Sequence, residues 1–464
     1  MRFSKLHLEN WRNFTYVDVA LQQRMFLIGA NATGKSNLLD VFRFLRDIVR
    51  VGGGFEKAVV DRGGVLRLRS LFTPGYPNIV IDVHLENDKN EVWRYRLAFG
   101  QDNQLRPVLK EEKVWRSGTL LLERPDEQDV ADKEQLRQTH LEQINSNRKF
   151  REIADFFNTI RYYHIVPQLV REPERSVGHK SDPYGGDFIE QIASLPLEIQ
   201  KSRLDRIENV LRAAVPQLRG LHMGKDLQGI PHLEGMYGSE GLVEPWQTET
   251  SFSDGTLRLI GLLWALLDEG GPLLLEEPEL SLHPGIVRYI PGMMAAIQRE
   301  HSRQILVSTH SSDLLRDEGI APDEVLILRP TPHGTKVELG AEIDLVRHLL
   351  DSGLTVAEAA LPTTQPPDAA KLSFLENSLS DNHLVVPEET LINVARTSPN
   401  RSIREDFVPR QGSGARVGVR YADRIIEFTT KHWQPDEAAK RSGSLRRCIN
   451  ALYTLKSWNK LDDS

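Results

Sequence analysis

The sequence is poor in cysteine, in long apolar runs and in surplus positive charge. Its 464 residues include one cysteine, Cys448, which excludes a disulfide-stapled scaffold and a zinc site built from cysteines alone. No apolar run approaches the roughly 20 residues that cross a membrane, and the first residues alternate in polarity, unlike a signal peptide. Acidic residues outnumber basic ones, 65 to 58, which argues against a globally basic nucleic-acid binder. We therefore expect a cytoplasmic protein with no membrane partner.

The composition is that of a globular protein, with 40% hydrophobic and 27% charged residues. Alternating apolar residues predict strands over 1–30 and an antiparallel strand region over 79–125. Short apolar runs predict buried strands, and they lie at 25–28, at 273–275 and within 304–308. Helical spacing is found over 38–48, 186–215 and 256–268. Strands that alternate with helices on this scale predict an α/β fold with a parallel sheet.

Other stretches lack a clear period. Glycine and proline over 51–78 predict loops with short elements, and the glycine-rich stretch 216–250 is interpreted as irregular. Charged residues crowd 126–150, among them Asp129, and favour a solvated surface. The segment 362–367, PTTQPP, is the best candidate for a linker.

A phosphate-binding loop is the strongest motif. Residues 29–36 read GANATGKS and fit the pattern G-x-x-x-x-G-K-[ST] in full. The buried strand 25–28 precedes the loop and an amphipathic helix follows it, as this motif requires. Backbone N–H groups around Gly29, Asn31 and Gly34 would then point at phosphate oxygens, assisted by the dipole of the helix.

The side chains for chemistry on a bound triphosphate are also present. Lys35 is expected to bridge the β- and γ-phosphates, and the Ser36 hydroxyl to ligate Mg²⁺. The segment 272–278, PLLLEEP, is an apolar strand that ends in two carboxylates. We assign Glu276 to the metal and Glu277 to polarisation of the attacking water, as general base.

Two further segments have residues suited to contact the phosphates of a nucleotide. Residues 252–256, FSDGT, open the apolar helix, so that Ser253 and Gly255 lie at a second anion-binding helix terminus. A chain that already has one phosphate cradle can use this second one for the nucleotide of another subunit; an ordinary helix cap is the alternative. His310 follows the strand 304–308 and is placed to contact a γ-phosphate. A lone histidine at a strand end is more often structural, but beside these other motifs the functional role is favoured.

Together these segments resemble the ATP-binding-cassette (ABC) ATPases, and more narrowly their RecF, SMC and OLD branch. The resemblance covers roughly 1–360. Its parts are the opening strand and turn at 6–14 with Arg12, the Walker A loop at 29–36, the signature at 251–256, Walker B at 273–277, the D-loop at 279–284 and the switch histidine at 308–311. It implies an α/β P-loop NTPase with an ABC-type head, in which a mixed sheet is flanked by helices, together with an antiparallel β/α insert and a small C-terminal region.

The resemblance also implies a division of the chain. We expect an N-terminal ATPase lobe over 1–78, an insert or lid over 79–250 and a C-terminal ATPase lobe over 251–361. The linker 362–367 would then lead to an accessory region over 368–464.

The mechanism implied by the resemblance is an ATP sandwich. Two heads would enclose two ATP molecules with Mg²⁺, and each site would combine the Walker residues and His310 of one chain with Ser253 and Gly255 of the other; Arg12 would contribute to the nucleotide site. Two departures from the family pattern stand out. Glu276 replaces the usual aspartate, and the usual metal-site glutamine has only Gln168 as a weak candidate.

The sequence of the C-terminal region, 368–464, does not predict a nuclease domain. The segment 383–389, HLVVPEE, lacks the glycine and the later pair of aspartates that such a domain needs. Several arginines there could contact phosphates, although a solvated basic face is the default: Arg401, Arg404, Arg410, Arg416 and Arg420.

Three functions remain open from the sequence. The first is an ATP-hydrolysing head in DNA repair or anti-phage defence, homo-oligomeric, with a separate effector such as a nuclease and with DNA as a possible ligand. The second is an ATP-locked scaffold in which hydrolysis is incidental. The third, a transporter's nucleotide-binding subunit, fits the long insert poorly.

Overall fold

The computed structural model describes residues 1–364, except positions 74, 76, 90, 269, the segment 173–183, and positions 240–241 and 352–353. The predicted accessory region 368–464, with the arginines named above and the segment 383–389, lies outside the described residues. Contacts group Met1–Ile343 with Thr355–Pro366 as one unit, whereas helix α13 (Asp344–Asp351) belongs to a second one.

The central sheet carries the predicted nucleotide motifs. Its strand order is β15-β14-β3-β13-β12-β8. The strands are β3 (Arg24–Gly29), β8 (Arg161–Tyr163), β12 (Leu273–Glu276), β13 (Ile305–Thr309), β14 (Val325–Thr331) and β15 (Gly334–Leu339). All neighbours pair in parallel except β14 and β15, which are antiparallel. The short apolar runs thus form the buried strands that the sequence predicts, and the sheet is mixed.

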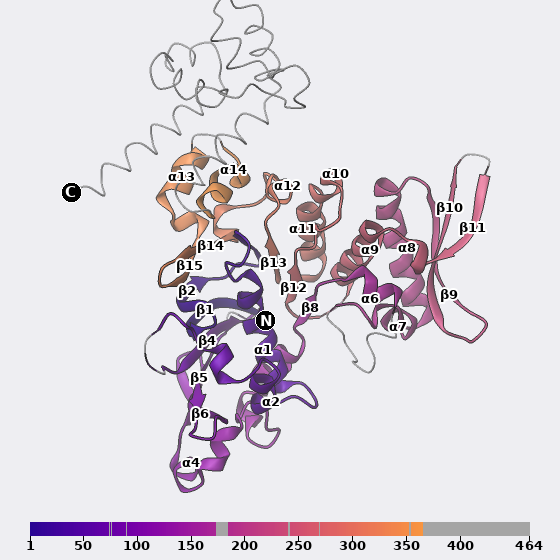
Figure 1. The fold of residues 1–464 in the computed structure, drawn as a ribbon. Coiled ribbons are helices and arrows are strands. Elements are labelled where there is room, and N and C mark those ends of the chain that lie inside the picture. Colours follow the sequence, from indigo (N-terminus) through magenta and orange to yellow (C-terminus); the bar gives the residue numbers. More distant parts are fainter. Residues whose placement is uncertain are drawn as a thin grey trace, which may run out of the picture. The chain divides into compact units, whose positions relative to one another are not determined.

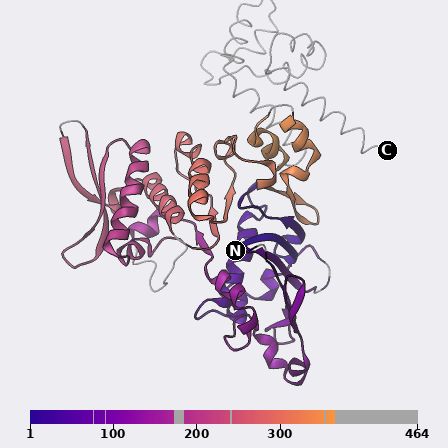
Figure 2. The same ribbon diagram turned by 180° about the vertical axis from the view of Figure 1, so that it is seen from behind.

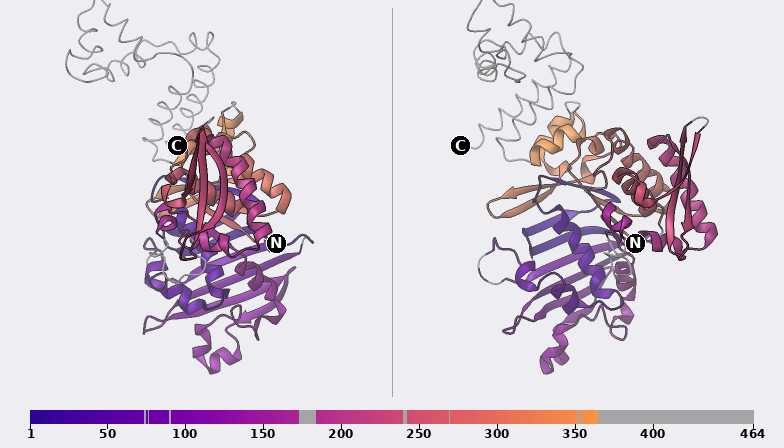
Figure 3. Two further views of the ribbon diagram at one scale, coloured as in Figure 1. Left: turned by 90° about the vertical axis from the view of Figure 1, so that its right-hand side faces the viewer. Right: turned by 45° about the vertical axis from the view of Figure 1, so that its right-hand side comes forward.

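An antiparallel sheet lies beside the central one, with the order β2-β1-β4-β5-β6-β7 (Figure 3, right). Its strands are β1 (Arg2–Trp11), β2 (Phe14–Ala20), β4 (Ile79–Glu86), β5 (Val92–Gln101), β6 (Pro107–Arg116) and β7 (Thr119–Arg124). Helix α1 (Lys35–Val49) shares one hydrophobic core with residues of both sheets. In that core the rings of Phe3 and Phe42 are 4.7 Å apart, centre to centre. Helix α1 is therefore packed against both sheets.

A third sheet, β11-β10-β9, packs with helices in a separate core (Figures 1 and 2). Figure 3 (left) looks toward it. Its strands are β9 (Leu218–Lys225), β10 (Pro231–Ser239) and β11 (Leu242–Thr248). The helices whose residues join this core are α6 (Pro167–Arg171), α7 (Phe188–Ala193), α8 (Leu197–Ala214) and α9 (Asp254–Leu267).

The remaining elements connect and cover these layers. The α-helices are α2 (Phe55–Val60), α3 (Val65–Leu68), α4 (Glu127–Ala131), α5 (Arg151–Asn158), α10 (Pro284–Val287), α11 (Ile290–His301), α12 (Ser312–Leu315) and α14 (Val356–Ala360). The 3-10 helices are η1 (Lys133–Arg137), η2 (Asn147–Lys149), η4 (Glu249–Ser251), η5 (Pro322–Glu324), η6 (Gly340–Glu342) and η7 (Leu361–Thr364). Within the described residues, no helix has the length and apolarity that a membrane crossing requires.

The interpretation of 216–250 as irregular was wrong, because glycines there lie inside strands. At Gly220 a side chain would approach the ring of Trp246 to 2.8 Å, and at Gly235 the ring of Phe252 to the same distance. These glycines make room for rings that cross the sheet. The helix predicted over 186–215 is also interrupted, since α7 ends at Ala193 and α8 begins after Pro196.

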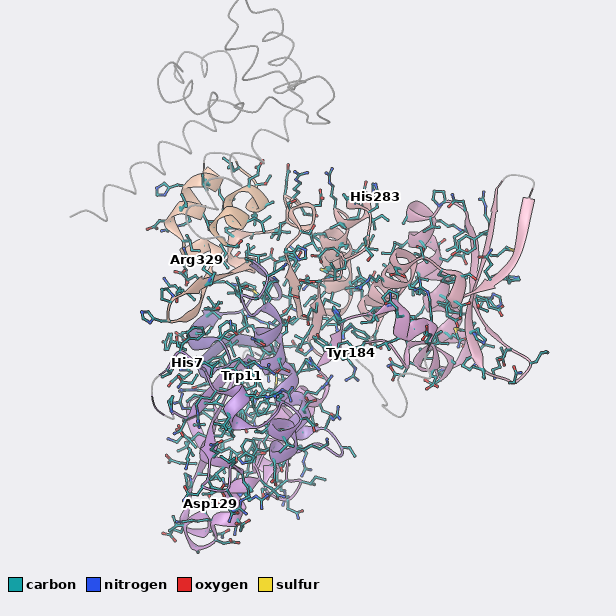
Figure 4. The ribbon with its side chains drawn as sticks, in the orientation of Figure 1. His7, Trp11, Asp129, Tyr184, His283 and Arg329 are labelled. Atoms are coloured by element: carbon teal, nitrogen blue, oxygen red, sulfur yellow. The ribbon has the colours of Figure 1, made fainter. Side chains whose placement is uncertain are left out.

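The prediction of a solvated surface over 126–150 was wrong for Asp129 (labelled in Figure 4), because its side chain is 0% exposed. Its Oδ2 accepts a hydrogen bond of 2.9 Å from Nε of Arg124. Nη1 of Arg124 also donates to Glu112 at 3.0 Å, and both side chains are buried. Burial raises the pKa of Glu112. A buried three-residue ion network therefore anchors α4 to the antiparallel sheet.

We expect Asp129→Ala to lower the free energy of unfolding by about 3–5 kcal/mol, because it leaves the Arg124 charge buried with one partner fewer. Urea denaturation measures this loss. Glu127→Ala, on the exposed side of α4, is the matched control and should stay within about 0.5 kcal/mol of the parent. Equal stability of the two variants would contradict the network's role.

Candidate nucleotide-binding site

The loop between β3 and α1 is shaped at two glycines. Gly34 has φ of 96°, a left-handed conformation, and a side chain there would approach Asn13 to 2.2 Å. At Gly29 a side chain would meet the Thr33 hydroxyl at 2.5 Å. Both positions therefore require glycine, as the phosphate-loop pattern predicts. Asn31, the third predicted backbone donor, is exposed at the crest of the loop.

Asn13, at the turn between β1 and β2, braces this loop. Its Nδ2 donates to the carbonyl of Thr33 at 2.7 Å and to the hydroxyl of Thr335 at 2.8 Å. Its Oδ1 accepts from Asn37 of α1 at 2.7 Å, and the indole of Trp11 (labelled in Figure 4) donates to the Asn37 carbonyl at 2.9 Å. The loop is thus held by hydrogen bonds from the antiparallel sheet.

Arg12 lies next to Asn13 with φ of 51°. Its Nη2 donates to Asp40 of α1 at 2.7 Å, and Arg62 pairs with the same carboxylate at 2.9 Å. Burial opposes ionisation of Asp40, but Arg62 outweighs it, and the pKa of Asp40 is lowered. The structure therefore places Arg12 on Asp40 of α1, and its contact with nucleotide remains a prediction.

The acidic end of β12 meets the start of α1. The Ser36 hydroxyl and Oε1 of Glu276 are hydrogen-bonded although they are 240 positions apart in the sequence. The other oxygen of Glu276 accepts a hydrogen bond from the hydroxyl of Tyr162, on β8. The structure thus brings together the two residues assigned to the metal.

Glu277 and His310 form the next pair along this edge. Nδ1 of His310 lies 3.2 Å from Oε1 of Glu277, and the backbone N–H of Glu277 donates to the Ser308 carbonyl at 3.0 Å. Glu277 has φ of 43°, so the chain turns sharply where β12 ends. A strained non-glycine residue at a strand end is a common mark of a functional position.

Lys35 lies among these acids but is itself largely covered. Its Nζ donates to the Gly29 carbonyl at 2.9 Å. Burial lowers its pKa, and the carboxylates of Glu277, Glu279 and Glu276 act in the opposite direction. The ammonium therefore lies in a poorly hydrated, acid-lined environment, where its attraction to an anion is strengthened.

Glu279 is the most buried of the three acids. Its Oε1 accepts from the Thr309 hydroxyl, whereas Oε2 is buried without a partner in the part of the chain that the structure describes. Burial raises the pKa of Glu279.

Ser253 and Gly255, predicted to serve a second subunit, belong to the start of α9. Ser253 is exposed and caps the helix, accepting from the N–H of Thr256 at 3.1 Å. A side chain at Gly255 would approach the Ser281 carbonyl to 2.7 Å. Among the described residues, Ser253 therefore contacts α9 and Gly255 lies against the segment 279–284. Neither belongs to the pairs beside Lys35, which are Ser36 with Glu276 and Glu277 with His310.

The donor set fits magnesium. The described residues contain no cluster of three or more acidic, histidine or cysteine side chains of the kind that holds a metal alone. Mg²⁺ prefers oxygen ligands and is usually held by one or two protein groups together with phosphates. The Ser36 hydroxyl and the Glu276 carboxylate are such groups, in mutual contact.

Sequence reasoning missed two residues of this edge, Tyr162 and His164. Nδ1 of His164 lies 3.2 Å from the carbonyl of Glu276. β8 has only three residues, too few for a periodic signal, so no pattern marked the strand. Gln168, the candidate for the metal-site glutamine, is exposed on α6.

A mixed sheet with a braced phosphate loop and an acidic strand end is the arrangement of an ABC-type P-loop ATPase. Residues 24–317 match the family described as "AAA domain, putative AbiEii toxin, Type IV TA system". This range is more than half of the chain, and the chain belongs to that family. The α/β fold class with an ABC-type head, predicted from the sequence, is confirmed.

Curated relatives match a smaller part. The chain is 29% identical over 118 residues to the phosphonates import ATP-binding protein PhnC 1 of Synechococcus sp. (strain JA-2-3B'a(2-13)), covering 25% of this chain and 45% of that protein. It is 29% identical over 119 residues to PhnC of Frankia casuarinae (strain DSM 45818 / CECT 9043 / HFP020203 / CcI3), covering 24% and 46%. The chain spans less than half the length of these relatives.

Solved SMC heads are similar over a larger part but at low identity. The SmcHead bound to the C-winged helix domain of ScpA has a TM-score of 0.47 at 14% identity, covering 73% of this chain and 97% of that one. The SMC head domain from Thermotoga maritima has a TM-score of 0.39 at 12% identity, covering 73% and 99%.

We expect Gly34→Ala to weaken ATP binding by at least about tenfold, because the added methyl group meets Asn13 and the left-handed backbone disfavours alanine. Titration with a fluorescent ATP analogue measures the affinity. Gly292→Ala is the control, since a side chain at Gly292, on α11, meets no atom within 4 Å. Unchanged affinity in Gly34→Ala would contradict the assignment of the loop.

Proposed function

We propose that the protein hydrolyses ATP with Mg²⁺ at the edge formed by the loop 29–36 and the end of β12. One observation carries the proposal: Ser36 and Glu276, 240 positions apart, are hydrogen-bonded beside Lys35. A phosphate cradle, a cation and two carboxylates that converge in this way suit phosphoryl transfer to water.

Each residue of the edge has a distinct role in this mechanism. Backbone N–H groups of the loop and Lys35 bind the β- and γ-phosphates, and Ser36 with Glu276 would hold the metal. Mg²⁺, when bound, neutralises charge that develops on the phosphate oxygens. Glu277 accepts the proton of the attacking water. His310 orients the Glu277 carboxylate through its contact of 3.2 Å and contacts the γ-phosphate.

We expect Lys35→Ala to lose ATP binding and turnover, because the loop loses its one buried cation. Glu277→Gln should bind ATP normally but turn it over at least about 100-fold more slowly, because the amide cannot accept the proton. Phosphate release and analogue titration separate the two effects. Lys110→Ala, at an exposed position on β6, is the control. Full turnover by Lys35→Ala would reject the proposal.

We further propose that ATP closes a homodimer of heads, with Ser253 and Gly255 of one subunit completing the site of the other. The exposure of Ser253 at the start of a 14-residue helix supports this, since the N–H groups and dipole of that terminus attract a phosphate. ATP then shifts the population toward the closed state, because only that state provides both sets of contacts.

We expect Glu277→Gln to elute as a dimer with Mg-ATP and as a smaller species without it, measured by size-exclusion chromatography with light scattering. Ser253→Asp in the same background should prevent dimerisation, because aspartate still caps a helix but repels the phosphate. Ser202→Asp, exposed on α8, is the matched control. Dimerisation of the Ser253→Asp protein would contradict the sandwich.

The biological role we propose is cytoplasmic anti-phage defence or DNA repair, in which the ATP state controls a separate effector such as a nuclease, with DNA as a possible ligand. The family description, with its AbiEii toxin and Type IV system, supports the defence alternative. An ATP-locked scaffold is the second candidate, and Glu276 in place of aspartate favours it. Biological activity that survives Glu277→Gln would select the scaffold.

The division of the chain stays a prediction, with parts at 1–78, 79–250 and 251–361, a linker at 362–367 and an accessory region at 368–464. At the start of that linker, in η7, Thr363 and Thr364 are buried.

A further inference from the structure

Tyr162 lies in the edge strand β8 and reaches the acidic end of the neighbouring strand. β8 runs parallel to β12, with Tyr162 paired to Leu274. The side chain is 5% exposed, and its hydroxyl donates to one oxygen of Glu276 while Ser36 binds the other. Both oxygens of this carboxylate therefore have a partner.

The guanidinium of Arg43 contacts the ring of Tyr162. Its guanidinium carbon lies 4.2 Å from the centre of the ring, within the range of a cation–π interaction. Arg43 and Ser36 both belong to α1, seven positions apart, which places them two turns apart on the same face of the helix. Ser36, Glu276, Tyr162 and Arg43 thus form a closed circuit of contacts that begins and ends on α1.

We infer that Tyr162 is a positioning residue that fixes the Glu276 carboxylate for the metal. The inference rests on the proposed ATPase function. Glutamate has one more rotatable bond than aspartate, so the carboxylate samples more orientations unless a partner restrains it. Mg²⁺ requires near-ideal octahedral geometry and therefore penalises such freedom. The Tyr162 hydroxyl donates a hydrogen bond to Oε2 of Glu276, which leaves Oε1 of the same carboxylate directed at Ser36.

The substitution Tyr162→Phe tests one contact of this circuit, the hydrogen bond from the Tyr162 hydroxyl to Glu276. Phenylalanine keeps the ring, its burial and its contact with Arg43, and removes only the donor to Glu276. Loops and strands should therefore stay in place, whereas the carboxylate loses one of its two partners. A purely structural tyrosine would show changed thermal stability, but not a selective loss of metal-dependent binding.

The experiment compares nucleotide affinity with Mg²⁺ and with EDTA, using a fluorescent, non-hydrolysable ATP analogue and the full chain. We expect the parent to bind more tightly with Mg²⁺, and Tyr162→Phe to lose about tenfold of that gain while its affinity in EDTA is unchanged. Tyr163→Phe, one position along the same strand, is the matched control and should behave as the parent. An equal Mg²⁺ gain in Tyr162→Phe and the parent overturns the inference and leaves the ATPase proposal intact. No Mg²⁺ gain in the parent overturns both.

A second variant tests the restraint itself. Glu276→Asp shortens the side chain by one methylene and withdraws the carboxylate from the Tyr162 hydroxyl. We therefore expect Tyr162→Phe to cost nothing further in the Glu276→Asp background, so that the two losses of Mg²⁺ gain are not additive. Additive losses would show that the Tyr162 hydroxyl acts independently of Glu276 and would overturn the inference.

Discussion

The hydrogen bond between Ser36 and Glu276 is the constraint on which the site depends. It joins the first turn of α1 to the end of β12, and it brings within reach two parts of the chain that are 240 positions apart. Parallel pairing of β3, β13 and β12 makes this meeting possible, because it places the carboxyl ends of the three strands at one edge of the sheet. Lys35, Glu277 and His310 reach that edge by the same topology.

The phosphate loop owes its shape to neighbours as much as to its own sequence. Asn13 bonds to the loop and to β15, so the turn between β1 and β2 braces the curve from outside. A cradle that is already curved loses less entropy when it binds phosphate. The antiparallel sheet thus supports the shape of the loop 29–36 from outside.

The sequence predicts those parts of the structure that obey a fixed pattern. The loop 29–36 and the apolar strands were recognisable because glycine, lysine and serine have obligatory positions there, and buried parallel strands have continuous apolar runs. Tyr162 was not recognisable, because its strand is only three residues long and its partner is remote in sequence. Asp129 misled because charge clusters are usually solvated, whereas its burial is offset by hydrogen bonds from Arg124 and from the backbone N–H of Asp126, which no sequence pattern reveals. The glycines of β9 and β10 made the segment look irregular. They are instead inside strands, where each leaves room for an aromatic ring of a neighbouring segment.

Gly235 has an effect well beyond its own strand. The ring of Phe252 fits over it, and the carbonyl of Phe252 is held by Arg171 at 2.7 Å. Ser253 follows Phe252 directly. The space left by the missing side chain of Gly235 therefore determines where Phe252 lies, and with it how far Ser253 projects from the start of α9. In the dimer proposed above, reshaping the socket under Phe252 would therefore tune the reach of one head toward another while the groups around Lys35 stay untouched, which would separate the evolution of assembly from the evolution of chemistry.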